Sequence, residues 1–225
     1  MEQMRKEFPQ LRTMEQMGKP YKIVHKQLAT GRTPIASAEN FIETFSAALE
    51  VDANEFIQRG PFEDGHVEQE IMYIPETGEH KFTGVYYMQT ANGLPVYGSR
   101  LMVLVRNVKH FPAVSATTDL RDVVGFIAPK RLVASEAVAL MAAATHLGRG
   151  ATVTSPEIMV FAGTEHAAHE PTAALVFEAS VGGPWDMATF KKVELVVDAR
   201  TGEVLHEVNQ ILEFVSQRDP NKKST

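Results

Sequence analysis

The apolar residues of this chain change their spacing along the sequence, from a helical period to an alternating one, and then make the same change again. In residues 35–51 they recur on one helical face, which collects Phe41, Ile42, Phe45, Ala48 and Leu49. From residue 68 to residue 118 they alternate with polar residues, as in half-buried strands. Residues 134–148 return to helical spacing, and alternating segments follow. Because helices and strands segregate, the pattern predicts an α+β fold of two successive helix-plus-antiparallel-sheet modules.

Residues that favour caps and turns predict where these elements end. Ser37 is the expected N-cap of the first helix and Ser135 that of the second, which should end before Gly148. The inner face of the second helix is expected to contain Val138, Met141, Ala142 and Thr145. Turn residues divide the alternating regions into predicted strands near 70–74, 81–89, 96–107, 110–118, 157–162, 173–181, 190–198 and 203–209.

The first 34 residues differ from the rest in charge. They hold seven Lys or Arg against three Glu, a net charge of +4, in a chain whose total is −6. They are also interrupted by Pro9, Pro20 and Pro34, so we predict a basic N-terminal arm with at most short ordered pieces such as Tyr21–Leu28. The cations are scattered and no aromatic residues alternate with them, so binding to nucleic acid is not expected.

The predicted domain organisation has four parts, separated by shifts in pattern and composition. The boundary between the two modules is placed at Ala128-Pro129-Lys130, where the alternating pattern has ended and the second helix has not begun. The parts are an arm over residues 1–34, a first module over 35–128, a second module over 129–215 and a polar tail over 216–225.

The sequence offers little to catalysis. It contains no cysteine, which excludes disulfides, thiol catalysis and cysteine-based zinc sites, and no apolar run reaches the ~20 residues that span a bilayer. Glu165–Glu170 contains two His but reads as an exposed loop between strands, and His206–Gln210 lacks the second His of a zinc-protease helix. Gly182–Trp185 reads as a hairpin loop, in which Trp185 either anchors a contact surface or fills the local core. We therefore expect no metal, no cofactor and no catalytic residue.

Residues 85–105, VYYMQTANGLPVYGSRLMVLV, combine two alternating apolar runs with several turn-forming residues. Asn92-Gly93 favours the positive-φ turn of a hairpin. Pro95 has no N–H and should lie at the edge or first residue of a strand, and Gly98 indicates a bulge or a close backbone approach. These features organise a scaffold and do not suggest a reactive site.

The same stretch resembles a known family. Gln89, Asn92-Gly93 and Pro95-Val96-x-Gly98 look like the propeptide motif of fungalysin and thermolysin metalloproteases. Downstream, Ser135-Glu136-Ala137 is similar to the helix of a PepSY domain, and Asp198-Ala199-x-Thr201-Gly202 is similar to its closing hairpin. The resemblance covers residues 35–212 and implies a cystatin-like or PepSY-like fold.

The resemblance also implies a function. A chain of this kind would be a non-catalytic pro-region that serves as intramolecular chaperone and inhibitor of a thermolysin-like zinc metalloprotease. Its partner would be the zinc catalytic domain, in cis or in trans, because this chain contains none. The implied localisation is secreted or cell-envelope, with the cytoplasm as the alternative. A stand-alone protein-binding, inhibitor or scaffold module of a larger extracellular protein is the alternative function.

Overall fold

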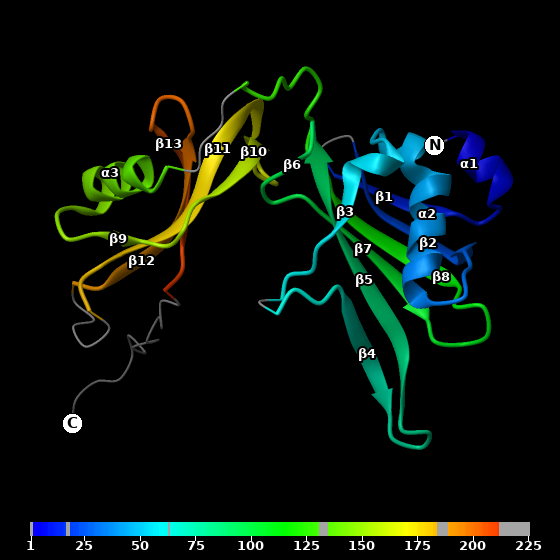
Figure 1. Cartoon of the computed structure of the whole chain (residues 1–225). Helices are drawn as coiled ribbons and strands as arrows, with labels where there is room; N and C mark the ends of the chain where they lie inside the picture. The colour runs from blue at the N-terminus through cyan, green and yellow to red at the C-terminus, as the bar shows by residue number, and fades with distance from the viewer. Residues whose placement is uncertain (1, 17–18, 63, 131–134, 184–188, 212–225) are drawn as a thin grey trace, which may run out of the picture. The chain divides into compact units, whose positions relative to one another are not determined.

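The computed structural model describes most of the chain, namely residues 2–16, 19–62, 64–130, 135–183 and 189–211 (Figure 1). Within these residues the fold is α+β, the class that the sequence predicts, with antiparallel sheets and few helices. The internal contacts divide the chain into two compact units. The first consists of Met1–Pro129 and Met159–Thr172, and the second of Lys130–Ile158 and Ala173–Thr225.

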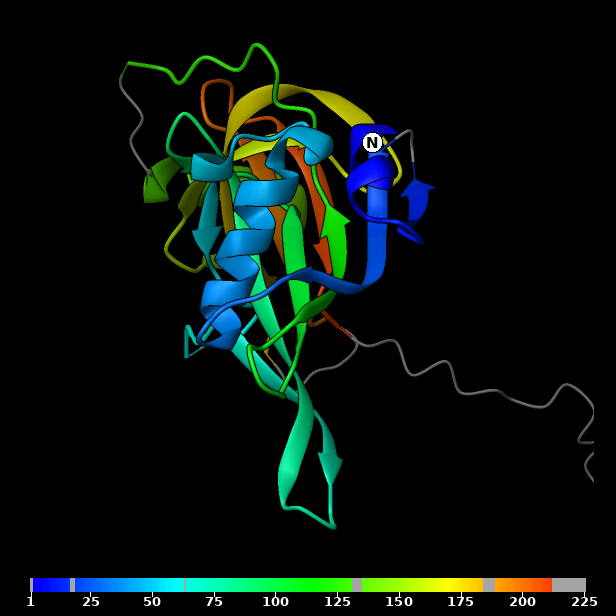
Figure 2. The same cartoon turned by 90° about the vertical axis from the view of Figure 1, so that its right-hand side faces the viewer.

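The first unit is built on a sheet with the order β1-β2-β8-β7-β5-β3, in which β4 and β6 also pair with β5. All of its strand pairs are antiparallel. Figures 1 and 2 show that β4 and the start of β5 project beyond the rest of this sheet as a hairpin. The strands are β1 (Arg12–Gln16), β2 (Lys19–Ala29), β3 (Phe56–Gln58), β4 (Glu68–Ile74), β5 (Glu79–Ala91), β6 (Leu94–Pro95), β7 (Arg100–Arg106) and β8 (Ala113–Asp119).

Helix α2 (Pro34–Leu49) begins earlier than predicted. The expected N-cap, Ser37, is wrong: it is a buried residue inside the first turn, and the cap is Thr33, whose hydroxyl accepts from the N–H of Ala36 at 3.1 Å. Pro34 at the first helical position needs no hydrogen-bond acceptor there, which is why Thr-Pro starts the helix. The helix ends at Leu49, after which Glu50 adopts a left-handed conformation and a short 3-10 turn, η1 (Ala53–Glu55), leads to β3.

The predicted face of α2 forms the core of the first unit. Phe41, Ile42, Phe45 and Leu49 are buried, as the spacing indicates. Successive residues of a strand point to opposite faces, so β7 places Leu101, Val103 and Val105 against the helix.

The N-terminal residues differ from the expected arm. Helix α1 (Glu2–Glu7) is followed by β1 and β2, and β2 pairs with β8, for example Ile23 with Ala116. Ile23 is fully buried, and the ring of Phe8 lies 5.1 Å from that of Phe45. These residues therefore belong to the sheet and core of the first unit. The pairing with β8 is a long-range contact that charge and proline content did not reveal.

The second unit contains helix α3 (Glu136–Leu147), which begins at the predicted cap Ser135. Two of the four residues predicted for its inner face are correct, since Ala142 is buried and Val138 packs against the core, but Met141 is 66% exposed and Thr145 is exposed. Ala139 and Ala143 take the remaining buried positions. An alanine-rich helix carries little periodic contrast, so the packing against the sheet selects the face. The strands of the second sheet, in the order β10-β11-β12-β13 with β9 beside β11, are β9 (Thr152–Val153), β10 (Glu157–Gly163), β11 (Ala168–Val181), β12 (Lys191–Asp198) and β13 (Val204–Asn209).

Candidate functional site

The Asn92-Gly93 turn of residues 85–105 connects β5 and β6 as a hairpin. Asn92 and Gly93 have φ of 49° and 80°, the positive values that this tight turn requires. Pro95 lies in the two-residue strand β6, opposite Thr90. Val96 follows it into the interior, where it is fully buried and donates its N–H to the carbonyl of Gln89 at 2.9 Å.

Two side chains of this hairpin hold a segment far away in the sequence. The amide of Gln89, which is 1% exposed, donates to the carbonyl of Arg121 at 3.2 Å and accepts from the N–H of Arg121 at 3.0 Å. The amide of Asn92 donates to the carbonyl of Phe126 at 2.7 Å. Residues 121–126 are therefore fixed to the hairpin by side chains in place of a strand ladder.

Ser99 and Gly98 complete this junction. The hydroxyl of Ser99 accepts from the N–H of Gln89 at 3.1 Å and donates to the carbonyl of Val96 at 2.8 Å. Gly98 has a φ of 68°, and a Cβ added there would lie 3.3 Å from Nη2 of Arg121. The close approach that the sequence indicates at Gly98 is therefore present, and the group that approaches its backbone is the Arg121 side chain.

The hairpin also contacts the part of β10 that belongs to the same unit. The N–H of Tyr97 donates to the carbonyl of Val160 at 2.9 Å, and Val96 and Val160 form an isolated parallel bridge. The six motif residues of the stretch are therefore brought together as a structural junction, namely Gln89, Asn92, Gly93, Pro95, Val96 and Gly98. The amides of Gln89 and Asn92 are already engaged by backbone groups of the chain.

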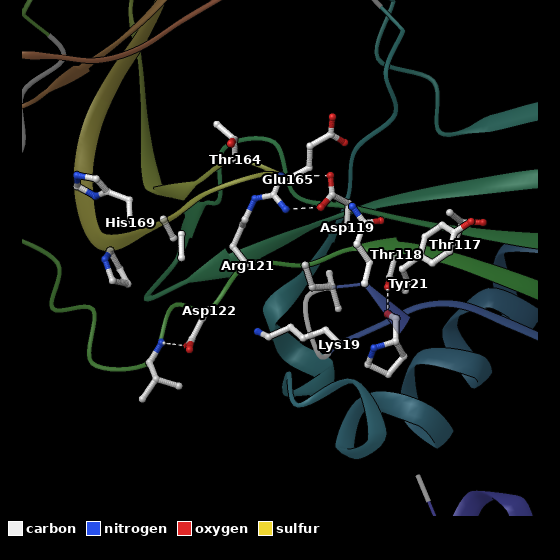
Figure 3. Close-up of a pocket in the computed structure, with 17 residues that line it drawn as sticks. Lys19, Tyr21, Thr117, Thr118, Asp119, Arg121, Asp122, Thr164, Glu165 and His169 are labelled. Carbon is white, nitrogen blue, oxygen red and sulfur yellow. Dashed lines mark hydrogen bonds and ion pairs between the residues drawn. The ribbon is translucent and has the colours of Figure 1, made fainter. Parts of the chain in front are cut away.

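Beside this junction the first unit has a pocket of about 710 Å³. Three segments line it, as Figure 3 shows: the start of β2 with Lys19 and Tyr21, the end of β8 at Asp119 with Arg121 just after it, and the turn from β10 to β11. The third segment supplies Glu165 and His169, among others. Because Gln89 holds Arg121, the hairpin junction positions one wall of the pocket.

Most of the charged side chains that line the pocket have partners within the chain. Both Nη atoms of Arg121 bind the carboxylate of Asp119, an arrangement in which a planar guanidinium matches two oxygens. Asp122 accepts from the N–H of Val124 at 3.1 Å, and Glu165 pairs with His166 at 3.1 Å. Nδ1 of His169 donates to the carbonyl of Glu170 at 2.7 Å.

The two predicted residues of the closing hairpin lie in the second unit. Gly202, with a φ of 76°, donates its N–H to the carbonyl of Asp198 at 2.9 Å in the turn from β12 to β13. The carboxylate of Asp198 accepts from the N–H groups of Arg200 at 2.8 Å and Thr201 at 2.7 Å. Partial burial alone would raise the pKa of Asp198, but the hydrogen bonds from Thr201 and Arg200 favour the charged form and leave the pKa lowered. This pair shapes a turn.

The His-rich stretches have the local structure that the sequence predicts. His166 is 82% exposed in the turn between β10 and β11, and His206 lies in strand β13. Among the described residues no group of His, Asp and Glu is arranged to hold a metal ion. Trp185 and the tail 216–225 lie outside the described residues.

Sequence reasoning missed the residues that line the pocket. Asp119 and Arg121 are two positions apart at the end of a strand, where opposite charges share one side, and this was the available local signal. Nothing local connects them with Lys19, which is brought close by the pairing of β2 with β8.

Comparison with known proteins identifies no family. No family model matches the chain, and no curated protein matches it. Among solved structures the chain is similar to the Bacillus megaterium YpeB C-terminal domain, with 8% sequence identity and a TM-score of 0.36, over 88% of this chain and 75% of that one. At this level the likeness assigns no activity. In the part of the chain that the structure describes, no helix is both long enough and apolar enough to cross a bilayer.

Proposed function

We propose that this chain is a non-catalytic protein-binding module that acts as chaperone and inhibitor of a thermolysin-like zinc metalloprotease, in cis or in trans. The proposal starts from the ordered motifs at Gln89–Gly98 and Asp198–Gly202, which resemble those of protease pro-regions. It includes two successive helix-plus-sheet modules of the cystatin-like and PepSY-like kind. It also includes a secreted or cell-envelope location, with the cytoplasm as the alternative.

One observation carries the proposal. The polar side chains of the motif are engaged in backbone hydrogen bonds that fix residues 121–126, as the pairs Gln89–Arg121 and Asn92–Phe126 illustrate. A motif used in this way builds a rigid support, and a rigid support lowers the entropy lost when a second folded chain docks. Binding a native-like partner stabilises that partner by mass action, which is the physical basis of chaperone action by a pro-region.

The projecting β4–β5 hairpin is the surface best suited to such a partner. Met72 and Tyr73 are 58% and 59% exposed on β4, and Ile57 is exposed on β3, which pairs with a later part of β5. Within the described part of the chain β4 pairs only with β5, so its other edge leaves backbone groups open to pairing. Exposed apolar side chains beside an open strand edge suit an extended segment of a partner, which could add as a further strand.

The test is to mix the purified chain with thermolysin and measure two quantities. We expect slow, tight inhibition of peptide hydrolysis and a higher yield of active protease after refolding from denaturant. Tyr73→Ala should weaken both effects, because an aromatic anchor at the centre of an interface is worth about 2 kcal/mol or more. Val108→Ala is the matched control, since Val108 is also exposed but lies in the loop between β7 and β8 and not on β4.

The outcomes separate the alternatives. Absence of both inhibition and assisted refolding would refute the chaperone–inhibitor proposal. A stand-alone binding or scaffold module is the second candidate, and the pocket beside Arg121 favours it, since a preformed pocket is typical of ligand binding. Reading the coding sequence beyond Thr225 distinguishes a protease in cis, which requires a His-Glu-x-x-His helix, from a partner in trans.

A further inference from the structure

The pocket of the first unit has no part in the proposed contact with a protease. Some of its hydrogen-bonding groups have partners within the chain and others do not. The carboxylates that line it already have partners within the chain, as described above for Asp119, Asp122 and Glu165. Among the described residues, the ammonium group of Lys19 and the hydroxyl of Tyr21 have no acceptor. Lys19 and Tyr21 therefore offer the pocket hydrogen-bond donors that no described group of the chain uses.

Arg121 lies in the wall of the pocket and is held there by groups of the chain itself. Its side chain is only 9% exposed, and both Nη atoms are occupied by Asp119. Its Nε is buried and has no hydrogen-bond partner among the described residues. Because this atom has no exposed surface, a ligand in the pocket does not reach it, and Arg121 forms a fixed part of the wall.

The rest of the lining is largely apolar. It includes Pro20, Leu120, Val124, Ala162, Ala168 and Pro171. The volume of about 710 Å³ lies within the range of pockets that enclose small organic ligands. A ligand that matches these walls has an apolar body and one group rich in acceptors.

We propose that this pocket binds a carboxylate joined to an apolar body, with Lys19 as its charged partner and Tyr21 as a second donor. A charge-assisted hydrogen bond between an ammonium group and a carboxylate is about twice as strong as a neutral one, which is why the acceptor is assigned as a carboxylate. Two sources carry this chemistry, a small organic acid and the C-terminal residue of a peptide. The inference does not depend on protease binding, so either proposal can fail without the other.

The experiment is a titration of the full-length, ¹⁵N-labelled chain followed by amide chemical shifts. Phenylacetate is compared with phenylacetamide, and acetyl-Ala-Phe with its C-terminal amide. We expect the carboxylates to bind with a Kd of about 1 mM or tighter, and the amides about tenfold more weakly. Shifts should concentrate on residues 19–21, 117–122 and 162–171. Tighter binding of the peptide identifies a chain end, and tighter binding of phenylacetate identifies a small acid.

Two variants and a control make the test specific. Lys19→Ala should weaken carboxylate binding about tenfold and leave amide binding unchanged, while Lys22→Ala, on the same strand but outside the pocket, should change neither. Ala168→Trp should block both ligands by filling the pocket at an exposed position. The amide spectrum of each variant reports its folding. Equal affinity for carboxylate and amide, unchanged binding by Lys19→Ala, or no shifts in the lining residues would overturn the proposal.

Discussion

The side chain of Gln89 binds the backbone of Arg121 in both directions, donating to its carbonyl at 3.2 Å and accepting from its N–H at 3.0 Å. The two residues are 32 positions apart in the sequence. A buried amide that serves as donor and acceptor at once replaces a piece of β ladder for a segment that has no strand partner. This contact links the motif to the wall of the pocket.

Replacing Gln89 by Glu should destabilise the first unit by about 2–4 kcal/mol, because the variant loses the donor and places a carboxylate in a buried site. Urea unfolding measures the change. Gln27→Glu is the control, since Gln27 is exposed and its side chain forms no hydrogen bond with the described residues. A loss below about 0.5 kcal/mol for Gln89→Glu would show that the two bonds contribute little.

Two glycines of the motif should respond differently to alanine. At Gly93 a Cβ meets nothing within 4 Å, so Gly93→Ala should cost only the positive φ, about 1 kcal/mol. At Gly98 the same strain is joined by a contact at 3.3 Å with Nη2 of Arg121, so Gly98→Ala should cost about 2 kcal/mol and shift the amide signals of residues 119–122. Thermal unfolding and amide spectra measure both effects, and equal costs would contradict the proposed role of the close approach.

At the N-terminus of α2, removing the hydroxyl group should lower the free energy of unfolding at one residue and leave it unchanged or raise it at another. Thr33→Ala removes the cap and should cost about 0.5–2 kcal/mol. The hydroxyl of Ser37 is buried without a partner among the described residues, so Ser37→Ala should be neutral or stabilising. Denaturant unfolding of the two variants compares them directly. The reverse order of stability would restore Ser37 as the cap.

Stability should fall at low pH through Asp198. Its pKa is lowered in the folded state, so its contribution is present above the unfolded pKa, near 4, and is lost as the pH falls through the lower folded value. Asp198→Ala should therefore destabilise the second unit at neutral pH by about 1–3 kcal/mol and reduce the loss of stability as the pH falls below about 4. The measurement is thermal unfolding at several pH values.

The control for this carboxylate is Asp52→Ala, because Asp52 is exposed and its side chain makes no capping bond. Its stability at neutral pH should stay within about 0.5 kcal/mol of the unsubstituted chain. If Asp198→Ala retained the full acid sensitivity, the hydrogen bonds from Arg200 and Thr201 would not be its source.

The sequence by itself determined the features that arise from local physical chemistry. The buried face of α2 follows from apolar spacing, since Phe41 and Phe45 must lie on one side of any helix that contains them. The turn at Asn92-Gly93 follows from the tolerance of these residues for positive φ. The antiparallel strands β4, β5, β7 and β8 follow from the alternating pattern and the turns between them, although their ends differ by a few residues.

Only the tertiary structure decided which distant segments meet. Lys19 and Arg121 line one pocket because β2 pairs with β8 and because Gln89 binds the backbone of Arg121. Neither contact can be recognised from the spacing of residues in the sequence. The buried face of α3 was decided in the same way, since alanines on several sides fit a sheet equally well until one face packs. Spacing records which side chains share a surface, whereas the contacts between surfaces depend on shape and on hydrogen-bonding groups that become neighbours only after folding.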